Sequence, residues 1–215
     1  MSHTLFNSIP VFVKDPINNN IDLGAVLQKL EKFLPVQFTN GVDSIYIGYF
    51  DILIDREINA MYQDGAIYVT NIQDDVDDMV DDIVHEFAHA VEDVYGHMLY
   101  ADNVIEEEFL GKRKRLYHII DGISPEENVS MEYYLNPEYD IEFDRYLYKD
   151  IGYPTLSSAI NGLFYSPYAI TSLREYFANG FEAYFFHRDR NTLKKISPIL
   201  YNKIVETIEE NTDEI

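Results

Sequence analysis

Two histidines four residues apart, with a glutamate directly after the first, could do chemistry in this chain. His85, Glu86 and His89 lie in the segment Asp-Asp-Ile-Val-His-Glu-Phe-Ala-His-Ala-Val-Glu, residues 81–92. In a helix, residues four apart lie on the same side, so both imidazoles can bind one zinc ion. Glu86 points about 100° away around the helix axis. It can therefore act as a general base on a water molecule without taking a coordination site.

The residues around this motif predict a helix whose apolar face leaves the two histidines out. Apolar side chains recur at helical spacing between residues 76 and 94. They are Val76, Val80, Ile83, Val84, Phe87, Ala88, Val91 and Val94. A histidine packed in the core would lie on this face, whereas His85 and His89 fall outside it. The pattern favours a metal site over a chance match.

A catalytic zinc ion needs a third protein ligand, and more than one residue qualifies. The spacing that puts a third histidine six residues after the second is absent, because residue 95 is tyrosine. Glu175 is the better candidate, on a helix predicted for residues 172–186, and Asn179 one turn later could hydrogen-bond a ligand. Ser172 and Glu175 also match a capping box, in which the glutamate only satisfies the helix start. The further candidates are Glu182 as the fallback ligand, His97 and His118.

The elements that must position these residues predict an α+β fold, mostly helical with a small mixed sheet. Strands are expected at 44–53, 58–63 and 66–70, with Asp64-Gly65 as a two-residue hairpin turn between the last two. The strand at 66–70 leads into the histidine helix, and we expect it to be an edge strand that pairs with an extended substrate. An ordinary hairpin covered by another strand is the alternative.

Helices are also expected outside the two informative ones, with irregular segments between them. The histidine helix should end near Gly96. The other helices are expected at 22–34, 103–120, 191–198 and 199–210. Residues 1–20 are expected to be rich in loops, and residues 122–156 to form an irregular excursion.

The composition describes an acidic chain without cysteine. Its 215 residues fit one domain, and its formal net charge of −22 argues against binding to nucleic acid or to an anionic membrane. Thiolate ligands and a cysteine nucleophile are excluded. No stretch is apolar enough for membrane insertion, and the first residues lack the pattern of a signal peptide. We expect a cytoplasmic protein by default, or one exported by a route that the sequence does not show.

An acidic run precedes the first histidine and has two interpretations. The run spans residues 74–82 and includes Asp74, Asp75, Asp77, Asp78 and Asp82. In the first interpretation, negative charge near a helix N-terminus interacts favourably with the helix dipole. In the second, Asp78 and Asp82, which precede His85 by one to two turns on the same side, rim a cleft and attract a protein or peptide substrate with basic residues.

Two segments resemble the catalytic domain of anthrax lethal factor and its relatives, a family that includes the Pro-Pro endopeptidases. One is residues 66–96, with His-Glu-Phe-Ala-His-Ala-Val at its centre. The other is residues 168–208, with Glu-Tyr-Phe-Ala-Asn-Gly-Phe followed by a helical tail that contains lysine and proline. Together they cover about a third of the chain. The pair of motifs is more specific than the first alone.

The resemblance implies a zincin-like metallopeptidase of the gluzincin type with one catalytic zinc ion. It implies that His85, His89 and Glu175 bind the metal and that Glu86 is the general base. It also assigns a role to Tyr168, because a tyrosine seven residues before the ligand glutamate faces the metal in this family.

Two features depart from the family pattern. The interval between the second histidine and Glu175 is longer than the family usually shows, which indicates an insertion at about 101–165. Asn179 stands where the family has an acidic residue one turn after the ligand glutamate. We therefore expect residues 1–215 to form a single zincin-like domain with an insertion.

The expected function is a zinc-dependent endopeptidase that hydrolyses peptide bonds with Glu86 as general base. The alternative is a catalytically idle binding or structural module with the same fold, such as a toxin subunit or a component of an assembly. The intact Glu86 argues against this alternative, because a binding module has no use for a general base. A zinc hydrolase acting on a non-peptide amide is a third interpretation, but the glutamate and tyrosine of the second motif fit peptidases better.

Overall fold

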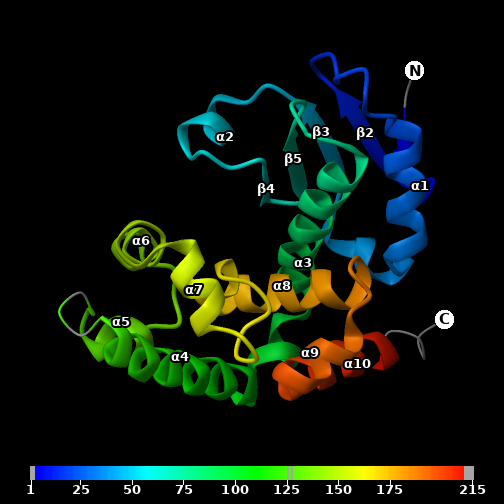
Figure 1. The fold of residues 1–215 in the computed structure, drawn as a ribbon. Coiled ribbons are helices and arrows are strands. Elements are labelled where there is room, and N and C mark those ends of the chain that lie inside the picture. The colour runs from blue at the N-terminus through cyan, green and yellow to red at the C-terminus, as the bar shows by residue number, and fades with distance from the viewer. Residues whose placement is uncertain (1–2, 125, 127, 211–215) are drawn as a thin grey trace. The chain divides into compact units, whose positions relative to one another are not determined.

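The protein is an α+β structure, described by a computed structural model for residues 3–124, 126 and 128–210. It divides into a first unit, Met1–Gly96, and a second unit, His97–Ile215. Figure 1 shows a small sheet in the first unit and only helical elements in the described part of the second. The expected α+β fold with a small mixed sheet is confirmed. The expectation of one domain with an insertion at about 101–165 stays a prediction.

The first unit is built on a five-stranded mixed sheet with the order β1-β2-β3-β5-β4. The strands are β1 (His3–Leu5), β2 (Ile9–Val13), β3 (Ser44–Gly48), β4 (Ala60–Gln63) and β5 (Ala66–Thr70). β2, β3 and β5 run parallel, while β1 and β4 are antiparallel to their neighbours. The inward-facing side chains are fully or almost fully buried: Val11, Ile45, Ile47, Ile67 and Val69.

Helices α1 (Leu23–Phe33) and α3 (Val76–Tyr100) lie beside this sheet (Figure 1). The Asp22 carboxylate begins α1 by accepting hydrogen bonds from the amides of Gly24 and Ala25. α1 then buries one side at Leu23, Val26 and Leu30. The shorter elements of this unit are the 3-10 helix η1 (Val36–Gly41) and the helix α2 (Asp51–Asp55).

The expectation that residues 66–70 form an edge strand is wrong. β5 pairs with β3 on one side and with β4 on the other, so its backbone has no open side. The hairpin itself is as predicted: Asp64 and Gly65 both have positive φ, which lets a two-residue turn fold β4 back along β5. The outer strand is therefore β4, and an extended substrate could pair only with β4 on this side of the sheet.

Other differences concern segments with weak local signals. Residues 1–20 contain the strands β1 and β2, although loops were expected. The expected strand at 44–53 stops at Gly48, where α2 soon follows. α3 continues past Gly96 to Tyr100. β1 and β2 form because they pair with each other and with β3, which outweighs their weak local propensity.

The second unit is a group of helices. The long members are α4 (Val104–Ile123), α8 (Leu173–Phe185) and α10 (Pro198–Glu210). Short ones complete it: α5 (Met131–Leu135), α6 (Ile141–Arg145), the π-helix η2 (Tyr146–Gly152), α7 (Tyr153–Ala159), the 3-10 helix η3 (Tyr168–Ile170) and α9 (Arg190–Ile196). The segment 122–156, expected to be irregular, is thus mostly helical in its described part.

Charged side chains on α4 hold this unit together. Glu108 accepts hydrogen bonds from the Tyr176 hydroxyl at 2.8 Å and from the first amides of α10 at 3.0 and 3.1 Å. Arg113, 1% exposed, donates to the carbonyl oxygens of Tyr133 and Asn136 at 2.6 Å each. Arg113 also stacks on the Phe143 ring, which folds the segment after α4 back onto that helix.

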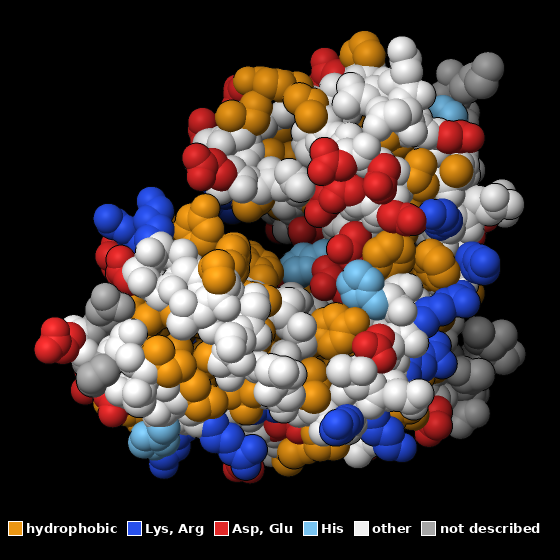
Figure 2. All heavy atoms as spheres, in the orientation of Figure 1, with side chains coloured by type: hydrophobic (Ala, Val, Ile, Leu, Met, Phe, Trp, Pro, Cys, Tyr) orange, Lys and Arg blue, Asp and Glu red, His pale blue; other side chains and the backbone are white. Residues whose placement is uncertain are grey.

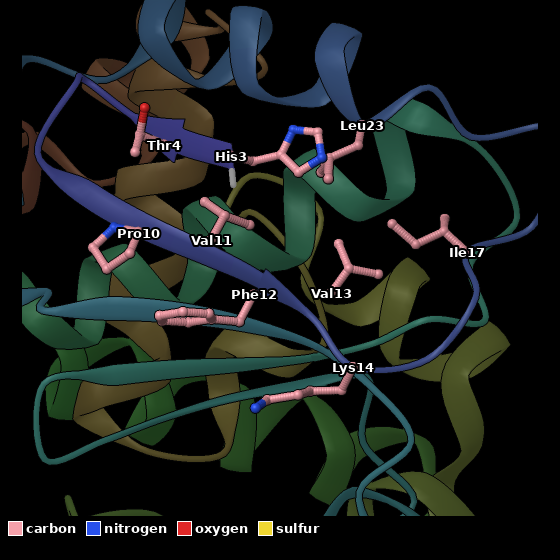
Figure 3. Close-up of a pocket in the computed structure, with 9 residues that line it drawn as sticks. All are labelled: His3, Thr4, Pro10, Val11, Phe12, Val13, Lys14, Ile17 and Leu23. Atoms are coloured by element: carbon pink, nitrogen blue, oxygen red, sulfur yellow. The ribbon is translucent and has the colours of Figure 1, made fainter. Parts of the chain in front are cut away.

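None of the helices in the described ranges is long and apolar enough to cross a membrane. A groove of about 560 Å³ in the first unit is lined by β1, β2 and the residues up to the start of α1 (Figure 3). None of its lining residues is one of the predicted site residues.

Candidate metal centre

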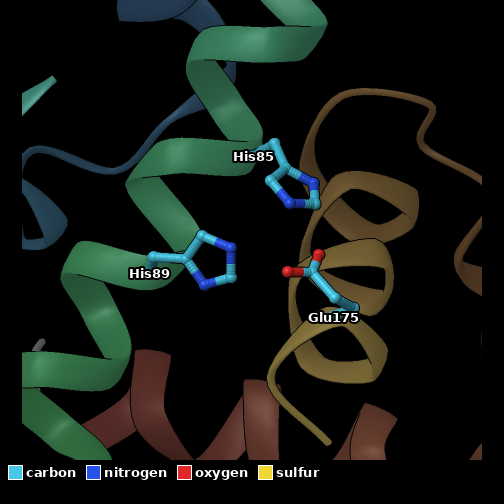
Figure 4. A group of neighbouring side chains, drawn as sticks. All are labelled: His85, His89 and Glu175. Carbon is cyan, nitrogen blue, oxygen red and sulfur yellow. The ribbon is translucent and has the colours of Figure 1, made fainter. Parts of the chain in front are cut away.

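α3 carries His85 and His89 on consecutive turns and on the same side (Figure 4). Their ring centroids lie 4.9 Å apart, and the ring planes make an angle of 79°. Two nitrogen ligands of one tetrahedral zinc ion lie about 3.4 Å apart when each bond is about 2.05 Å long. Rings with this separation can supply such a pair of nitrogens. The donor set therefore fits a zinc ion.

The carboxylate of Glu86 is held in place by the outer strand of the sheet. Glu86 is only 7% exposed, and its Oε2 accepts a hydrogen bond of 2.6 Å from the backbone amide of Tyr62 on β4. Tyr62 faces Ile67 across the hairpin, in the pair next to the one that closes the turn. The amides of such a pair point away from the partner strand, towards the open side of β4. The outer strand thus orients the predicted base.

Glu92 lies on the same side of α3 as His89 and contacts it. Its Oε2 lies 2.9 Å from Nδ1 of His89, one turn earlier on the same helix. The side chains of His89 and Glu92 are 12% and 5% exposed. Because Nδ1 is engaged by this carboxylate, Nε2 is the nitrogen with which His89 can bind a metal ion.

The acidic run has a structural role at the start of α3. Asp75 Oδ1 accepts hydrogen bonds from the amides of Asp77 and Asp78 at 2.7 and 3.0 Å, and Asp78 accepts from the amide of Asp74 at 3.0 Å. Asp77 also pairs with Lys29 of α1. These contacts support the first interpretation of the run, in which the aspartates stabilise the helix N-terminus.

Asp82 differs from the rest of the run in its partner and in its pKa. It accepts a hydrogen bond of 2.8 Å from Nε2 of Gln73, a side chain that is itself 4% exposed. Burial raises the pKa of the Asp82 carboxyl to about 6, with smaller contributions from Asp78 and Glu86 in the same direction. Asp82 therefore gains its full negative charge only near neutral pH.

Glu175 lies in the first turn of α8 and is half-buried; Figure 4 labels it. Ser172 is the N-cap of this helix, and its Oγ accepts a hydrogen bond of 3.2 Å from the amide of Glu175. The serine half of the predicted capping box is therefore present. Glu182, the fallback ligand, lies two turns later on α8 and is also half-buried.

Asn179 connects α8 to the segment that carries Tyr168. Its Nδ2 donates to the backbone oxygen of Glu175 at 3.1 Å, and its Oδ1 accepts a short hydrogen bond from Oγ of Ser166. Ser166 in turn accepts a hydrogen bond of 3.3 Å from the amide of Ala169. Tyr168 lies within this segment, on η3, and is 39% exposed. Asn179 thus supports the backbone near Glu175 and Tyr168.

The structure assembles the predicted residues as two sets, one in each unit. His85, Glu86 and His89 come together on two turns of α3. Glu175, Asn179 and Tyr168 come together around the start of α8. That both sets serve one metal ion is part of the function proposed in the next section.

Sequence reasoning missed two contributors to the first set. Glu92 follows His89 by three residues, which is helical spacing for a contact, so this contact could have been predicted from position alone. The Tyr62 amide left no signal in the sequence, because every residue except proline carries a backbone donor.

Comparison with known proteins adds no relative. No protein-family model matches the chain, and neither a curated protein nor a solved structure matches it. The function of the chain has to be inferred from the geometry of the two sets of residues.

Proposed function

We propose that the chain is a zinc-dependent endopeptidase with a zincin-like fold, in which His85, His89 and Glu175 bind one zinc ion. The observation that carries the proposal is the pair of adjacent imidazoles on α3, together with Glu86, whose carboxylate is buried and oriented by β4. A helix that only needed to be stable would gain nothing from burying this carboxylate.

The chain's own residues would divide the reaction between them. A bound zinc ion would polarise the scissile carbonyl and lower the pKa of a water molecule. Glu86 accepts the proton from the attacking water and passes it to the leaving amine. The Tyr168 hydroxyl donates a hydrogen bond to the developing oxyanion.

The outer strand β4 gives the proposed substrate a place to bind. An extended peptide can add to β4 as a further strand, and its main chain would then lie alongside Glu86. This arrangement replaces the role first expected of residues 66–70, whose strand is covered on both sides.

Peptides with basic residues are the substrate class that the charge pattern supports. Figure 2 shows acidic side chains gathered over the first unit where α3 begins. Several of these aspartates also serve the helix start, but their negative charge still attracts cations. We expect cleavage of peptides with lysine or arginine near the scissile bond to exceed that of matched neutral peptides, and added salt to reduce the difference.

The experiment that tests the proposed function is cleavage of a peptide library by the zinc-loaded chain. The wild type should cleave and a chelator should stop it. Glu86→Gln should retain zinc and lose at least about 100-fold in kcat. Glu107→Gln, which removes the same charge from an exposed site on α4, should cleave like the wild type.

Two outcomes would count against the proposal. If the zinc-loaded wild type cleaves no peptide, the non-catalytic binding module becomes the better account. If Glu86→Gln cleaves as fast as the wild type, Glu86 is not the base.

A further inference from the structure

We propose that Glu92 is a positioning residue for the metal: it holds the His89 ring by Nδ1 and so directs Nε2 at the zinc ion. This inference rests on the proposed zinc site and adds a residue to it that the motif does not contain. Glu92 itself does not bind the metal, and it acts only through His89.

The local geometry of α3 makes this contact possible. Side chains three residues apart lie on the same side of a helix, and each leans towards the helix N-terminus. Glu92 therefore reaches back to His89, and its Oε2 lies 2.9 Å from Nδ1. A carboxylate in this position fixes both the ring orientation and the tautomer with the proton on Nδ1.

Burial distinguishes this pair from an ordinary surface ion pair. The two side chains are 12% and 5% exposed, so the Glu92 carboxylate has little contact with water. A divalent cation bound at Nε2 would polarise the imidazole and strengthen its N–H as a donor to this carboxylate. The contact would in turn hold the His89 ring in the orientation that the metal needs.

The test is the zinc affinity of the full chain, measured by competition with a chelating dye. Glu92→Ala should bind zinc about 10- to 100-fold more weakly than the wild type, as expected when the partner of a metal-bound histidine is removed. Glu92→Gln, which can still accept the hydrogen bond but lacks the charge, should lie between the two. Asp93→Asn removes the same charge from the next, exposed residue and should bind zinc within about twofold of the wild type.

A second measurement covers the case in which these variants fail to fold. Nitrogen-15 NMR of the zinc-loaded wild type should show the His89 proton on Nδ1. If the contact between His89 and Glu92 were purely structural, the Glu92 variants would have a lower thermal stability than the wild type in the zinc-free state. Their zinc affinity would be unchanged.

The outcomes separate this inference from the proposed function. If the wild type binds no zinc, the proposed function fails. If the wild type binds one zinc ion and both Glu92 variants bind it equally tightly, or if the His89 proton lies on Nε2, only the positioning role of Glu92 is overturned.

Discussion

Glu86 is the residue whose orientation matters most for the proposed reaction, and the first unit fixes that orientation with a hydrogen bond. Its carboxylate would be costly to bury without partners, and the Tyr62 amide provides one at 2.6 Å. A base held in this way does not have to be reoriented when substrate arrives. The position of Glu86 is thus set by both α3 and β4.

Tyr168 allows a separate test at the residue scale. Tyr168→Phe removes only the hydroxyl, so zinc content should not change, while kcat should fall by about 100-fold because an oxyanion donor is lost. Steady-state kinetics and elemental analysis of the same preparation measure both effects. An unaltered kcat would mean that the seven-residue spacing to Glu175 is coincidental.

The sequence predicts which residues share one side of a helix where local spacing alone decides it. His85, Glu86 and His89 were assigned because helical periodicity alone places them, and the structure has them on one helix. Asn179 was expected beside a ligand side chain, but it bonds the backbone oxygen of Glu175 and Ser166. That choice depends on how the 166–170 segment packs on α8, which no pattern in the sequence describes.

Among the helices and strands, the sequence predicts those with strong hydrophobic periodicity and a clear capping or turn residue at the end. The helices at 22–34 and 172–186 and the Asp64-Gly65 hairpin were placed within a few residues. The helices at 131–159 were missed because they are short, and short helices depend on tertiary contacts. Arg113 supplies such contacts from α4, by binding the carbonyls of Tyr133 and Asn136.

The stability of the second unit should depend on Glu108, a half-buried charge on α4. Glu108→Ala should lower the free energy of unfolding by about 3 kcal/mol, because the buried Tyr176 hydroxyl and two amides of α10 lose their acceptor. Urea denaturation measures the change. Glu107→Ala, at the neighbouring exposed position, should change it by less than about 0.5 kcal/mol, and an equally small effect for Glu108→Ala would show that it does not hold α10.

Lys112 should make the stability of the protein depend on pH in the alkaline range. Burial lowers the pKa of its ammonium to about 8, and Glu108 opposes this only in part. The unfolded chain, with a lysine pKa of about 10.4, then binds more protons than the folded chain between about pH 8 and 10, so stability rises with pH there.

The Lys112→Met variant tests this dependence. Urea denaturation of the wild type at pH 8 and 10 should show a gain of up to about 2 kcal/mol that is smaller in the variant. Above pH 10 the trend should reverse, because burial raises the pKa of Tyr134 and Tyr176. Identical pH profiles for the two proteins would show that Lys112 keeps an ordinary pKa in the fold.

At the scale of the whole molecule, the proposed ligands come from both units: two from α3 and one from α8. A zinc ion bound by all three would link the stability of the units, since it binds only when both are folded. Zinc should therefore raise the unfolding temperature of the whole chain in differential scanning calorimetry. A shift confined to one of two resolved transitions would mean that a single unit supplies all the ligands.

The zinc content of the purified chain tests the central claim most directly. After removal of metal with a chelator and dialysis against trace zinc, elemental analysis should find one zinc ion per wild-type chain and almost none in His89→Ala. Glu175→Ala should hold zinc more weakly than the wild type and lose it on further dialysis. Equal zinc content in the wild type and His89→Ala would contradict the account, because no zinc site would then exist on α3.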